Sequence, residues 1–203
     1  MKKIAIVGHK GKMGKLIKKA LENKFVICGV GRENSLEDFD DIDLVIDFAT
    51  HETSLISAEY CLKKNIPLII GSTGQTEQEN ERINEISKQI ELIKKANFSM
   101  GIEILKLFIE NVSNLKPDRF EIIEKHHKDK KDKPSGTALE LEKFIKEKCG
   151  GDIKTISIRE GEEMGEHSVV AFIKDEKILM KHNVYSRETF VRGLVYEVEK
   201  ILS

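Results

Sequence analysis

The sequence has few cysteines, no long hydrophobic run and almost no net charge. Its three cysteines, Cys28, Cys61 and Cys149, are odd in number and widely spaced, so they fit neither a disulfide framework nor a zinc site. We expect them to be small core residues, and we expect no metal. No apolar run approaches the roughly 18 residues of a membrane span, and the N-terminal one is too short for a signal peptide. Lys and Arg number 34 against 35 Asp and Glu, so at net charge −1 no overall field attracts nucleic acid or an acidic membrane. These absences predict a cytoplasmic globular protein with no nucleic-acid or membrane partner.

The first half of the chain alternates short apolar runs with longer helical patterns. We expect strands at residues 4–7, 25–30, 44–48, 67–70 and 90–93. We expect helices at 12–23, 51–64 and 76–88, where apolar residues recur at helical spacing. Such alternation implies right-handed crossovers and a parallel sheet covered on both faces. The sequence therefore predicts a Rossmann-like, doubly wound α/β domain that binds a nucleotide.

The pattern changes after Asn97. A helix (102–112), a strand (119–124), a basic loop and a second helix (139–149) are followed by strands at 153–158, 168–173 and 177–182 with no helix between them. This order predicts a separate α+β unit, an antiparallel or mixed sheet with helices on one face. A final amphipathic helix at 189–202 is too short to be a domain and is expected to return to the first one. We therefore expect a dinucleotide-binding domain at residues 1–97 plus 187–203, and a substrate-binding and oligomerisation domain at 98–186.

A glycine-rich loop follows the first expected strand directly and leads into the first helix. Its sequence is GHKGKMG, from Gly8 to Gly14. Gly8 permits a tight turn, Gly11 lets the backbone approach a pyrophosphate, and Gly14 lets the helix pack on the strand. The spacing departs from the G-x-G-x-x-G form of dinucleotide-binding proteins. A glycine-rich turn that binds no ligand is therefore the alternative.

The end of the second expected strand bears on the choice of nucleotide. An acidic residue usually binds the adenosine ribose there, but this position is occupied by Gly31. Arg32, with Lys10 and Lys12 in the loop, favours a 2′-phosphate and so NADPH, or the use of both nucleotides. Glu33 keeps NADH open as a cofactor.

Residues 124–138, EKHHKDKKDKPSGTA, combine proton donors, positive charge and a helix-opening turn. His126 and His127 follow an apolar β-like run, so along a strand they point to opposite faces and only one need enter a cleft. Residues 134–137 then offer hydroxyl and backbone N–H groups just before a helix. A helix N-terminus beside a lysine suits a carboxylate or a phosphate. The stretch predicts a site for a small dianion that has to be protonated, and a basic solvated loop with a Ser/Thr cap is the alternative.

Taken together, these features resemble the 4-hydroxy-tetrahydrodipicolinate reductase (dihydrodipicolinate reductase) family, over the whole chain. The most specific sign is the motif at 124–138, with its paired histidines, a lysine four residues after the first, and P-S-G-T-A. The other signs are the glycine loop at 8–14, VIDFAT at 45–50, GSTG at 71–74, ANFSMG at 96–101, GEH at 165–167 and S-R-x-x-F-x-x-G at 186–193. Between Ile158 and Gly165 the chain has only a few residues where many family members have more.

The resemblance implies NAD(P)H-dependent reduction of 4-hydroxy-tetrahydrodipicolinate to tetrahydrodipicolinate, in the diaminopimelate pathway of lysine biosynthesis, by a cytoplasmic homotetramer. His126 and Lys130 would be the catalytic proton donors, and His127, Lys130, Gly136 and Thr137 would bind the substrate carboxylates. His167 and His182 lie within strand patterns, and neither is given a role. The cofactor positions implied are Gly8, His9, Lys10, Gly11, Lys12, Met13, Arg32, Gly71, Ser72, Thr73, Lys95, Ala96, Asn97 and Phe98.

Two other functions compete with this one. A nucleotide-dependent reductase of another imine or a semialdehyde would share the first domain, but residues 126–137 argue against it. A non-catalytic dinucleotide-binding redox sensor would need no such combination of His126, Lys130 and Thr137. Such a sensor usually carries a nucleic-acid-binding element, and the neutral charge and the lack of a helix-turn-helix pattern do not supply one.

Overall fold

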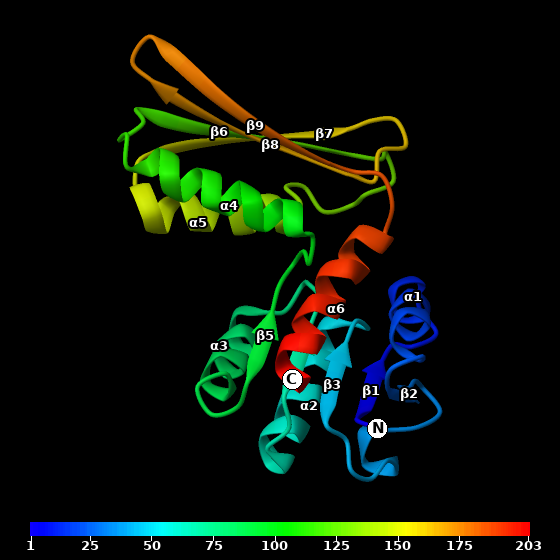
Figure 1. Cartoon of the computed structure of the whole chain (residues 1–203). Helices are drawn as coiled ribbons and strands as arrows, with labels where there is room; N and C mark the ends of the chain where they lie inside the picture. The colour runs from blue at the N-terminus through cyan, green and yellow to red at the C-terminus, as the bar shows by residue number, and fades with distance from the viewer. The chain divides into compact units, whose positions relative to one another are not determined.

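The chain folds into two compact units, which Figure 1 shows in a computed structural model of all 203 residues. One unit comprises Met1–Phe98 and Val191–Ser203, and the other comprises Ser99–Phe190. The expected domain boundaries were 97/98 and 186/187. In the structure the chain leaves the first unit after Phe98 and re-enters it at Val191, inside the last helix.

The first unit is built on a five-stranded parallel sheet with the order β2-β1-β3-β4-β5. The strands are β1 (Lys3–Val7), β2 (Val26–Val30), β3 (Leu44–Asp47), β4 (Leu68–Ile70) and β5 (Leu92–Lys94). Their apolar runs are nearly continuous because both faces of the sheet are buried. All five lie where the sequence predicted strands, with ends shifted by a few residues.

Two pairs of helices cover the two faces of this sheet. Ile4 and Ile6 of β1 point to the face covered by α1 (Lys12–Leu21) and α6 (Glu188–Leu202). Ala5 and Val7 point to the opposite face, covered by α2 (His51–Lys64) and α3 (Glu77–Ile86), with a short helix η1 (Leu36–Asp38) nearby. The doubly wound fold predicted from the sequence is confirmed, and the final helix α6 packs on the first sheet.

The second unit is a four-stranded mixed sheet with the order β7-β6-β8-β9 and two helices on one face. Its elements are α4 (Met100–Ser113), β6 (Arg119–His126), α5 (Gly136–Cys149), β7 (Asp152–Arg159), β8 (Gly165–Ile173) and β9 (Glu176–Val184). β6 pairs with β7 in parallel, and the other pairs are antiparallel. Alternate residues of β6, Phe120 and Ile122, pack against Leu105 of α4 and Leu141 of α5. The mixed sheet predicted from the sequence is confirmed.

Several elements extend beyond their expected bounds, and two of these extensions take in residues expected to bind the substrate. β6 runs to His126 rather than ending at Glu124, so His126 is a strand residue. α5 begins at Gly136 rather than Leu139, because the Ser135 hydroxyl caps it by accepting a hydrogen bond from the N–H of Ala138 at 3.2 Å. Gly136 and Thr137 therefore belong to the first turn of the helix.

The three cysteines are free thiols that pack as small apolar residues. Cys28 and Cys61 are buried in the first unit, and Cys149 is half-buried at the end of α5. Burial raises the pKa of Cys61 to about 12, so this thiol stays protonated and inert. A search of the helices for a segment both long and apolar enough to cross a bilayer finds none.

We predict that Gly193→Ala destabilises the first unit, because a Cβ at Gly193 would collide with the carbonyl oxygen of Phe98. Overpacking of this kind costs about 1–3 kcal/mol, and the helix propensity of Ala returns at most about 1 kcal/mol. Urea denaturation followed by circular dichroism measures the free energy of unfolding. Tyr196→Ala, on the same helix and exposed, is the control and should change it by less than about 0.5 kcal/mol. A Gly193→Ala variant as stable as the parent would contradict this account of α6 packing.

Candidate active site

The carboxyl ends of four of the five parallel strands carry every residue expected to bind the nucleotide. The glycine loop follows β1, Arg32 follows β2, the turn 71–73 follows β4 and residues 95–98 follow β5. Because the strands are parallel, these segments lie along one edge of the sheet, where ligands of open α/β sheets bind. The structure thus brings the predicted cofactor residues to a common edge.

The glycine loop has the geometry of a pyrophosphate-binding turn. Gly8 has a φ of +84°, a left-handed conformation that favours glycine, and a Cβ there would lie 2.9 Å from the Cβ of Ala49. The N–H of Gly11 donates to the carbonyl of Gly8 at 2.9 Å, which closes the turn. A Cβ at Gly14 would collide with the same carbonyl. The backbone can therefore approach a ligand closely at the N-terminus of α1, where the helix dipole favours an anion.

Two loop residues expected to contact the cofactor use their side chains to hold the loop in place. The imidazole of His9 makes a hydrogen bond through Nδ1 with the carbonyl of Val30 at 2.9 Å. Its ring also fills the space beside Gly29, where a Cβ would lie 2.7 Å from the His9 ring. Met13 packs against the apolar core beneath α1. Both side chains are half-buried and shape the loop from within.

Glu33 occupies the place that the end of β2 leaves open at Gly31. A Cβ at Gly31 would lie 3.0 Å from Oε2 of Glu33, so the Glu33 carboxylate folds back over the position of the missing acidic residue. Glu33 also forms an ion pair with Lys10 of the glycine loop, and the Lys10 ammonium lowers the pKa of Glu33. Both residues line a cavity of about 660 Å³. The other residues that line it are Val7, Gly8, Gly11, Val30, Gly31, Arg32, Ala49, Thr50 and Thr53.

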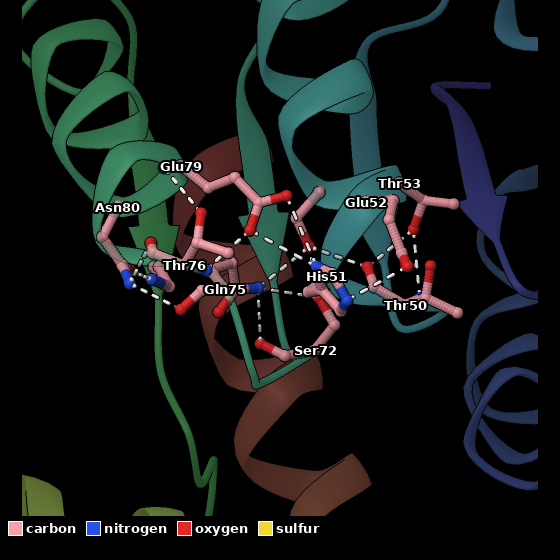
Figure 2. A network of polar contacts seen from close by, with 11 residues as sticks. Thr50, His51, Glu52, Thr53, Ser72, Gln75, Thr76, Glu79 and Asn80 are labelled. Atoms are coloured by element: carbon pink, nitrogen blue, oxygen red, sulfur yellow. Dashed lines mark hydrogen bonds and ion pairs between the residues drawn. The ribbon is translucent and has the colours of Figure 1, made fainter.

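The turn at 71–73 is anchored by a polar network that joins it to α2 and α3. Figure 2 shows Ser72 and Gln75 on one side of this network and His51 on the other. The Ser72 hydroxyl contacts Ser54 of α2, and Nε2 of Gln75 donates to Ser72 Oγ at 3.2 Å. The imidazole of His51 lies 3.3 Å from the carboxylate of Glu79, at the start of α3. The turn is therefore held by side chains of both flanking helices.

A buried carboxylate organises the turn after β3 in a similar way. Asp47 has no exposed surface. Its Oδ1 accepts from the N–H of Ala49 at 3.0 Å and from the Thr53 hydroxyl at 3.1 Å, and its Oδ2 accepts from the Ser57 hydroxyl at 2.7 Å. Burial raises the pKa of Asp47, and these three hydrogen bonds oppose that shift. Sequence reasoning gave Asp47 no role, although it lies in the VIDFAT segment.

The segment after β5 presents backbone more than side chains. Lys95 Nζ forms an ion pair with Glu197 of α6 at 2.7 Å, and Phe98 is buried against the ring of Phe48, with ring centroids 5.6 Å apart. Asn97 is buried and Ala96 is exposed. A nucleotide contact at Lys95 or Phe98 would therefore be made by the main chain.

The second unit gathers the residues expected to bind the substrate at the end of β6 and the start of α5. β6 alternates, so Glu124 and His126 continue the buried face begun by Phe120 and Ile122. His126 is 7% exposed, whereas His127 lies just past the strand and is half-buried. Only His126 enters the interior, and the N–H of His127 donates to the carbonyl of Glu163 at 2.9 Å.

Lys130 and Gly136 share one carboxylate partner. Lys130 Nζ lies 2.7 Å from Oδ1 of Asp132, and the N–H of Gly136 also donates to the Asp132 carboxylate. Burial raises the pKa of Asp132, but the Lys130 ammonium and these N–H groups outweigh it and hold the pKa below its usual value. Thr137 follows in the first turn of α5 and is buried. The structure thus brings Lys130 and the start of α5 together around one carboxylate, that of Asp132, and the binding of a substrate anion here stays a prediction.

Four residues without a predicted role complete this site: Glu124, Ser135, Arg159 and His167. Nδ1 of His126 lies 2.5 Å from Oε2 of Glu124, and Arg159 of β7 grips both oxygens of the same carboxylate. The ring of His167, from β8, meets the His126 ring edge-on, with centroids 5.2 Å apart. A signal for Glu124 was present in the sequence, since residues two apart on a strand share a face. Arg159 and His167 come from other strands through the sheet register, so no local pattern indicated them.

His167 is buried and His182 is half-buried, and burial lowers the pKa of both rings. Burial lowers the pKa of His167 to about 3, helped by the positive charge at His126. Its Nε2 lies 3.3 Å from the Ser135 hydroxyl that caps α5. Burial also lowers the pKa of His182, whose Nε2 lies 3.1 Å from the Ser99 hydroxyl. Nδ1 of each ring is buried with no hydrogen-bond partner.

The fold defines a class of protein: a pyridine-nucleotide-dependent oxidoreductase with a Rossmann-like unit and a second, α+β unit. The model of the N-terminal domain of dihydrodipicolinate reductase matches residues 2–98, and that of the C-terminal domain matches residues 101–203. The chain belongs to the dihydrodipicolinate reductase family.

Individual relatives agree with this assignment. The chain is 33% identical to a 4-hydroxy-tetrahydrodipicolinate reductase of Thermosipho africanus, over 99% of this chain and 92% of that protein. It is 34% identical to the enzyme of that name from Wigglesworthia glossinidia brevipalpis, over 94% of this chain and 74% of that protein. Among solved structures, a dipicolinate-bound dihydrodipicolinate reductase from Paenisporosarcina sp. TG-14 has the same fold, with a TM-score of 0.75 at 20% identity and coverage of 99% and 94%. An aspartate dehydrogenase from Thermotoga maritima shares the fold at a TM-score of 0.64 and 16% identity, over 100% and 97% of the two chains.

Proposed function

We propose that this protein reduces 4-hydroxy-tetrahydrodipicolinate to tetrahydrodipicolinate with NAD(P)H, in the diaminopimelate pathway of lysine biosynthesis. The observation that carries the proposal is the juxtaposition in the second unit of a carboxylate-supported histidine with a lysine and a helix N-terminus. This arrangement suits a cyclic dicarboxylate that must be bound as an anion and then protonated. Family membership supports the same reaction.

The substrate carboxylates are assigned to the start of α5 and to the loop before it. The Lys130 ammonium and the Gly136 N–H already engage the carboxylate of Asp132, so they can bind the same group on a ligand. Thr137 adds a hydroxyl, and His127 adds a ring at the end of β6. A substrate carboxylate would share these donors with Asp132 or replace it.

The proton is assigned to His126 or Lys130. When bound, NAD(P)H supplies a hydride, which adds to a carbon of the conjugated imine and leaves electron density on the ring. An imidazolium at His126 or the ammonium of Lys130 neutralises that charge by giving up a proton. Water leaves the substrate before the reduction, so the net change is the loss of a hydroxyl and the gain of a hydrogen.

The first unit would hold the nucleotide along the carboxyl edge of its sheet. The glycine loop of residues 8–13 suits the pyrophosphate, and the 660 Å³ cavity suits the adenosine end near Arg32. A second cavity of about 420 Å³ shares Val30 and Thr53 with it, and its apolar residues Leu36 and Ile56 suit a purine ring. The turn at 71–73 and residues 95–98 would flank the nicotinamide end.

We predict that His126→Ala and Lys130→Ala each lower kcat far more than they weaken nucleotide binding. General acid groups contribute about 10²–10⁴-fold to rate. The test is a nicotinamide-oxidation assay with freshly made cyclised substrate, combined with a separate titration of nucleotide binding. Lys131→Ala is the matched control, because Lys131 lies in the same basic loop but is exposed, and this variant should keep the parental rate. If both site variants stay within a few-fold of the parent, the assignment of these residues is wrong.

A further prediction concerns the choice between NADPH and NADH. Arg32, Lys10 and Lys12 should favour NADPH, or at least allow both nucleotides, because charge-assisted contacts to a 2′-phosphate have no counterpart in NADH. Arg32→Ala should lower kcat/KM for NADPH by about tenfold or more, which corresponds to about 1.4 kcal/mol, and should leave NADH nearly unaffected. Glu33→Ala should have the opposite selectivity, because its carboxylate lies where a ribose hydroxyl would be bound. A parental enzyme with a strong NADH preference would show that Glu33, rather than Arg32, governs the choice.

We also predict that the protein forms a homotetramer. The helices α4 and α5 cover one face of the second sheet, and on the other face Leu179 of the edge strand β9 is 55% exposed, beside Val170 of β8. An open sheet face with an uncovered edge strand favours packing against copies of the same chain. Size-exclusion chromatography with light scattering should give four times the chain mass of 23.1 kDa, and Leu179→Lys should lower it. If the parental protein is a monomer at working concentration, the tetramer prediction is wrong, and the proposed reaction is unaffected.

A further inference from the structure

The carboxylate of Glu124 is the most completely enclosed charged group in the second unit. It has no exposed surface. Arg159 binds it through two parallel contacts, Nη1 to Oε2 at 2.9 Å and Nη2 to Oε1 at 2.7 Å. The N–H of Ser135 donates to Oε1 at 3.3 Å, and Nδ1 of His126 lies 2.5 Å from Oε2. A carboxylate buried this deeply persists only when its partners compensate for its lost hydration.

These partners keep Glu124 ionised. Burial raises its pKa, but hydrogen bonds from Arg159, Ser157 and His126 outweigh burial and bring the pKa down to about 2. An ionised carboxylate can only accept hydrogen bonds, so Nδ1 of His126 must carry a hydrogen whether the ring is neutral or charged. The ring can then release a proton from Nε2 alone.

We propose that Glu124 and Arg159 are positioning residues for the reduction, which hold the Nδ1–H of His126 so that this ring gives its proton from Nε2. The inference rests on the proposed function and selects His126, rather than Lys130, as the proton donor. Its chemistry is balanced by three changes. The hydride adds its electron pair to the substrate carbon, the Nε2–H bond breaks, and the proton neutralises the substrate anion while His126 becomes a neutral ring that keeps Nδ1–H.

The space around Nε2 agrees with this role. A Cβ at Gly165, the first residue of β8, would lie 3.0 Å from His126 Nε2 and 3.4 Å from its Cδ2. A side chain there would crowd the nitrogen that the mechanism requires. The His167 ring packs edge-on against the His126 ring and limits its rotation. The ring is therefore held on one side by Glu124 and left open at Nε2 by glycine.

Arg159 connects the histidine to the loop that carries Lys130. Its Nη2 also donates to the main-chain carbonyl of Asp132 at 2.6 Å. Asp132 in turn pairs with Lys130 through its side chain. One guanidinium thus fixes both the carboxylate behind His126 and the backbone of the anion-binding loop.

The charged groups around His126 determine how its pKa responds when one of them is removed. Burial lowers the pKa of His126, and the Glu124 carboxylate from the same strand opposes that shift. The positive charges of Lys130, in the loop, and Arg159, on β7, lower the pKa further. His167, on β8, is neutral above its own pKa of about 3. Glu124 is therefore the group that favours the imidazolium, and removing its charge lowers the pKa of His126.

A metal ion is a weaker explanation for this cluster. Ligand atoms of Glu124, His126 and His167 lie within 4.8 Å of one another, which a metal could span. However, both Glu124 oxygens already bind a guanidinium, whose positive charge repels a cation. The geometry therefore favours a Glu124 carboxylate that orients a proton donor over one that binds a metal ion.

The first test needs neither substrate nor cofactor. Long-range ¹H–¹⁵N NMR of the parental protein, with His126 assigned from His126→Gln, reports which ring nitrogen carries the hydrogen. We expect the neutral ring to be the Nδ1–H tautomer, and Glu124→Gln to lose that preference and to lower the pH at which the ring titrates. An Nε2–H tautomer in the parental protein would overturn the proposal whether or not Glu124→Gln folds.

The second test uses steady-state kinetics of Glu124→Gln. A donor that must be protonated is active below its pKa, so the parental kcat falls as pH rises through the His126 pKa. In Glu124→Gln this fall should move to lower pH, and kcat at neutral pH should decrease about 10–100-fold, the usual effect of losing an orienting partner. KM for the dicarboxylate should change by less than about threefold. This is smaller than a tenfold change, which corresponds to about 1.4 kcal/mol. The double variant Glu124→Gln/Arg159→Gln avoids an unpaired buried guanidinium. It should lose kcat to a similar extent, but its fall should move to lower pH by a smaller amount, because removing the Arg159 charge raises the pKa of His126.

The matched control is Glu140→Gln, which removes the carboxylate of another partly buried ion pair in this unit, Glu140 with Lys106 at 2.5 Å. It should lower stability without moving the pH profile. If Glu124→Gln is folded and keeps the parental pH profile, or the double variant is folded and keeps the parental kcat, while His126→Ala is inactive, the positioning role is wrong and the proposed function stands. If the parental protein oxidises neither nucleotide with the substrate, the proposed function fails, and the tautomer result alone decides the role of Glu124.

Bound zinc in stoichiometric amount, whose removal abolishes the parental rate, would also overturn the proposal.

Discussion

The buried ion pair between Glu124 and Arg159 is the interaction on which the substrate unit depends. It joins neighbouring strands, β6 and β7, at the point where the sheet gives way to the basic loop. The same carboxylate receives the N–H of Ser135 at the start of α5, and the same guanidinium binds the carbonyl of Asp132. Removal of either partner would leave a buried charge unpaired, which is costly in a protein interior. One contact thus fixes the strand end, the loop and the helix start that carry the residues proposed to bind the substrate.

The nucleotide unit uses its residues in a different way. Its glycines matter for the atoms they lack, since side chains at Gly8, Gly14 and Gly71 would strike the neighbouring backbone or the Phe48 ring. Several side chains at the same edge are engaged by the protein itself, as with His9 on the Val30 carbonyl and Lys95 on Glu197. The unit therefore presents backbone to a ligand along this edge, together with the exposed side chains of Lys10, Lys12 and Arg32. Such a surface suits a phosphate-rich cofactor, because main-chain N–H groups are donors whose positions the fold determines.

Local periodicity predicted most of the fold. Strands buried on both faces are short continuous apolar runs, and the helices between them show apolar residues at a spacing of three to four. Two of the errors of extent arose where polar residues lie on buried surfaces: β6 continues past Glu124 to the polar His126, and Ser135 caps α5 earlier than its first expected residue. The loop chemistry around Lys130 could also be predicted, because it lies in one contiguous stretch. Arg159 and His167 could not be placed from the sequence, since their contact with His126 depends on the pairing of β6 with β7 and β8. The conformation in which the Glu33 side chain bends back over Gly31 could not be predicted either, because no periodic pattern encodes it.

The central claim is that a hydride passes from the nicotinamide to a cyclic dicarboxylate bound at residues 126–137. The most direct measurement is isotope transfer from NADPH that carries two deuterium atoms at C4 of the nicotinamide, followed by mass spectrometry of the product. The account predicts that tetrahydrodipicolinate is one mass unit heavier than the product made with unlabelled NADPH, and that the deuterium is bound to carbon and does not exchange with water. An unlabelled product, formed while the nucleotide is oxidised, would contradict it.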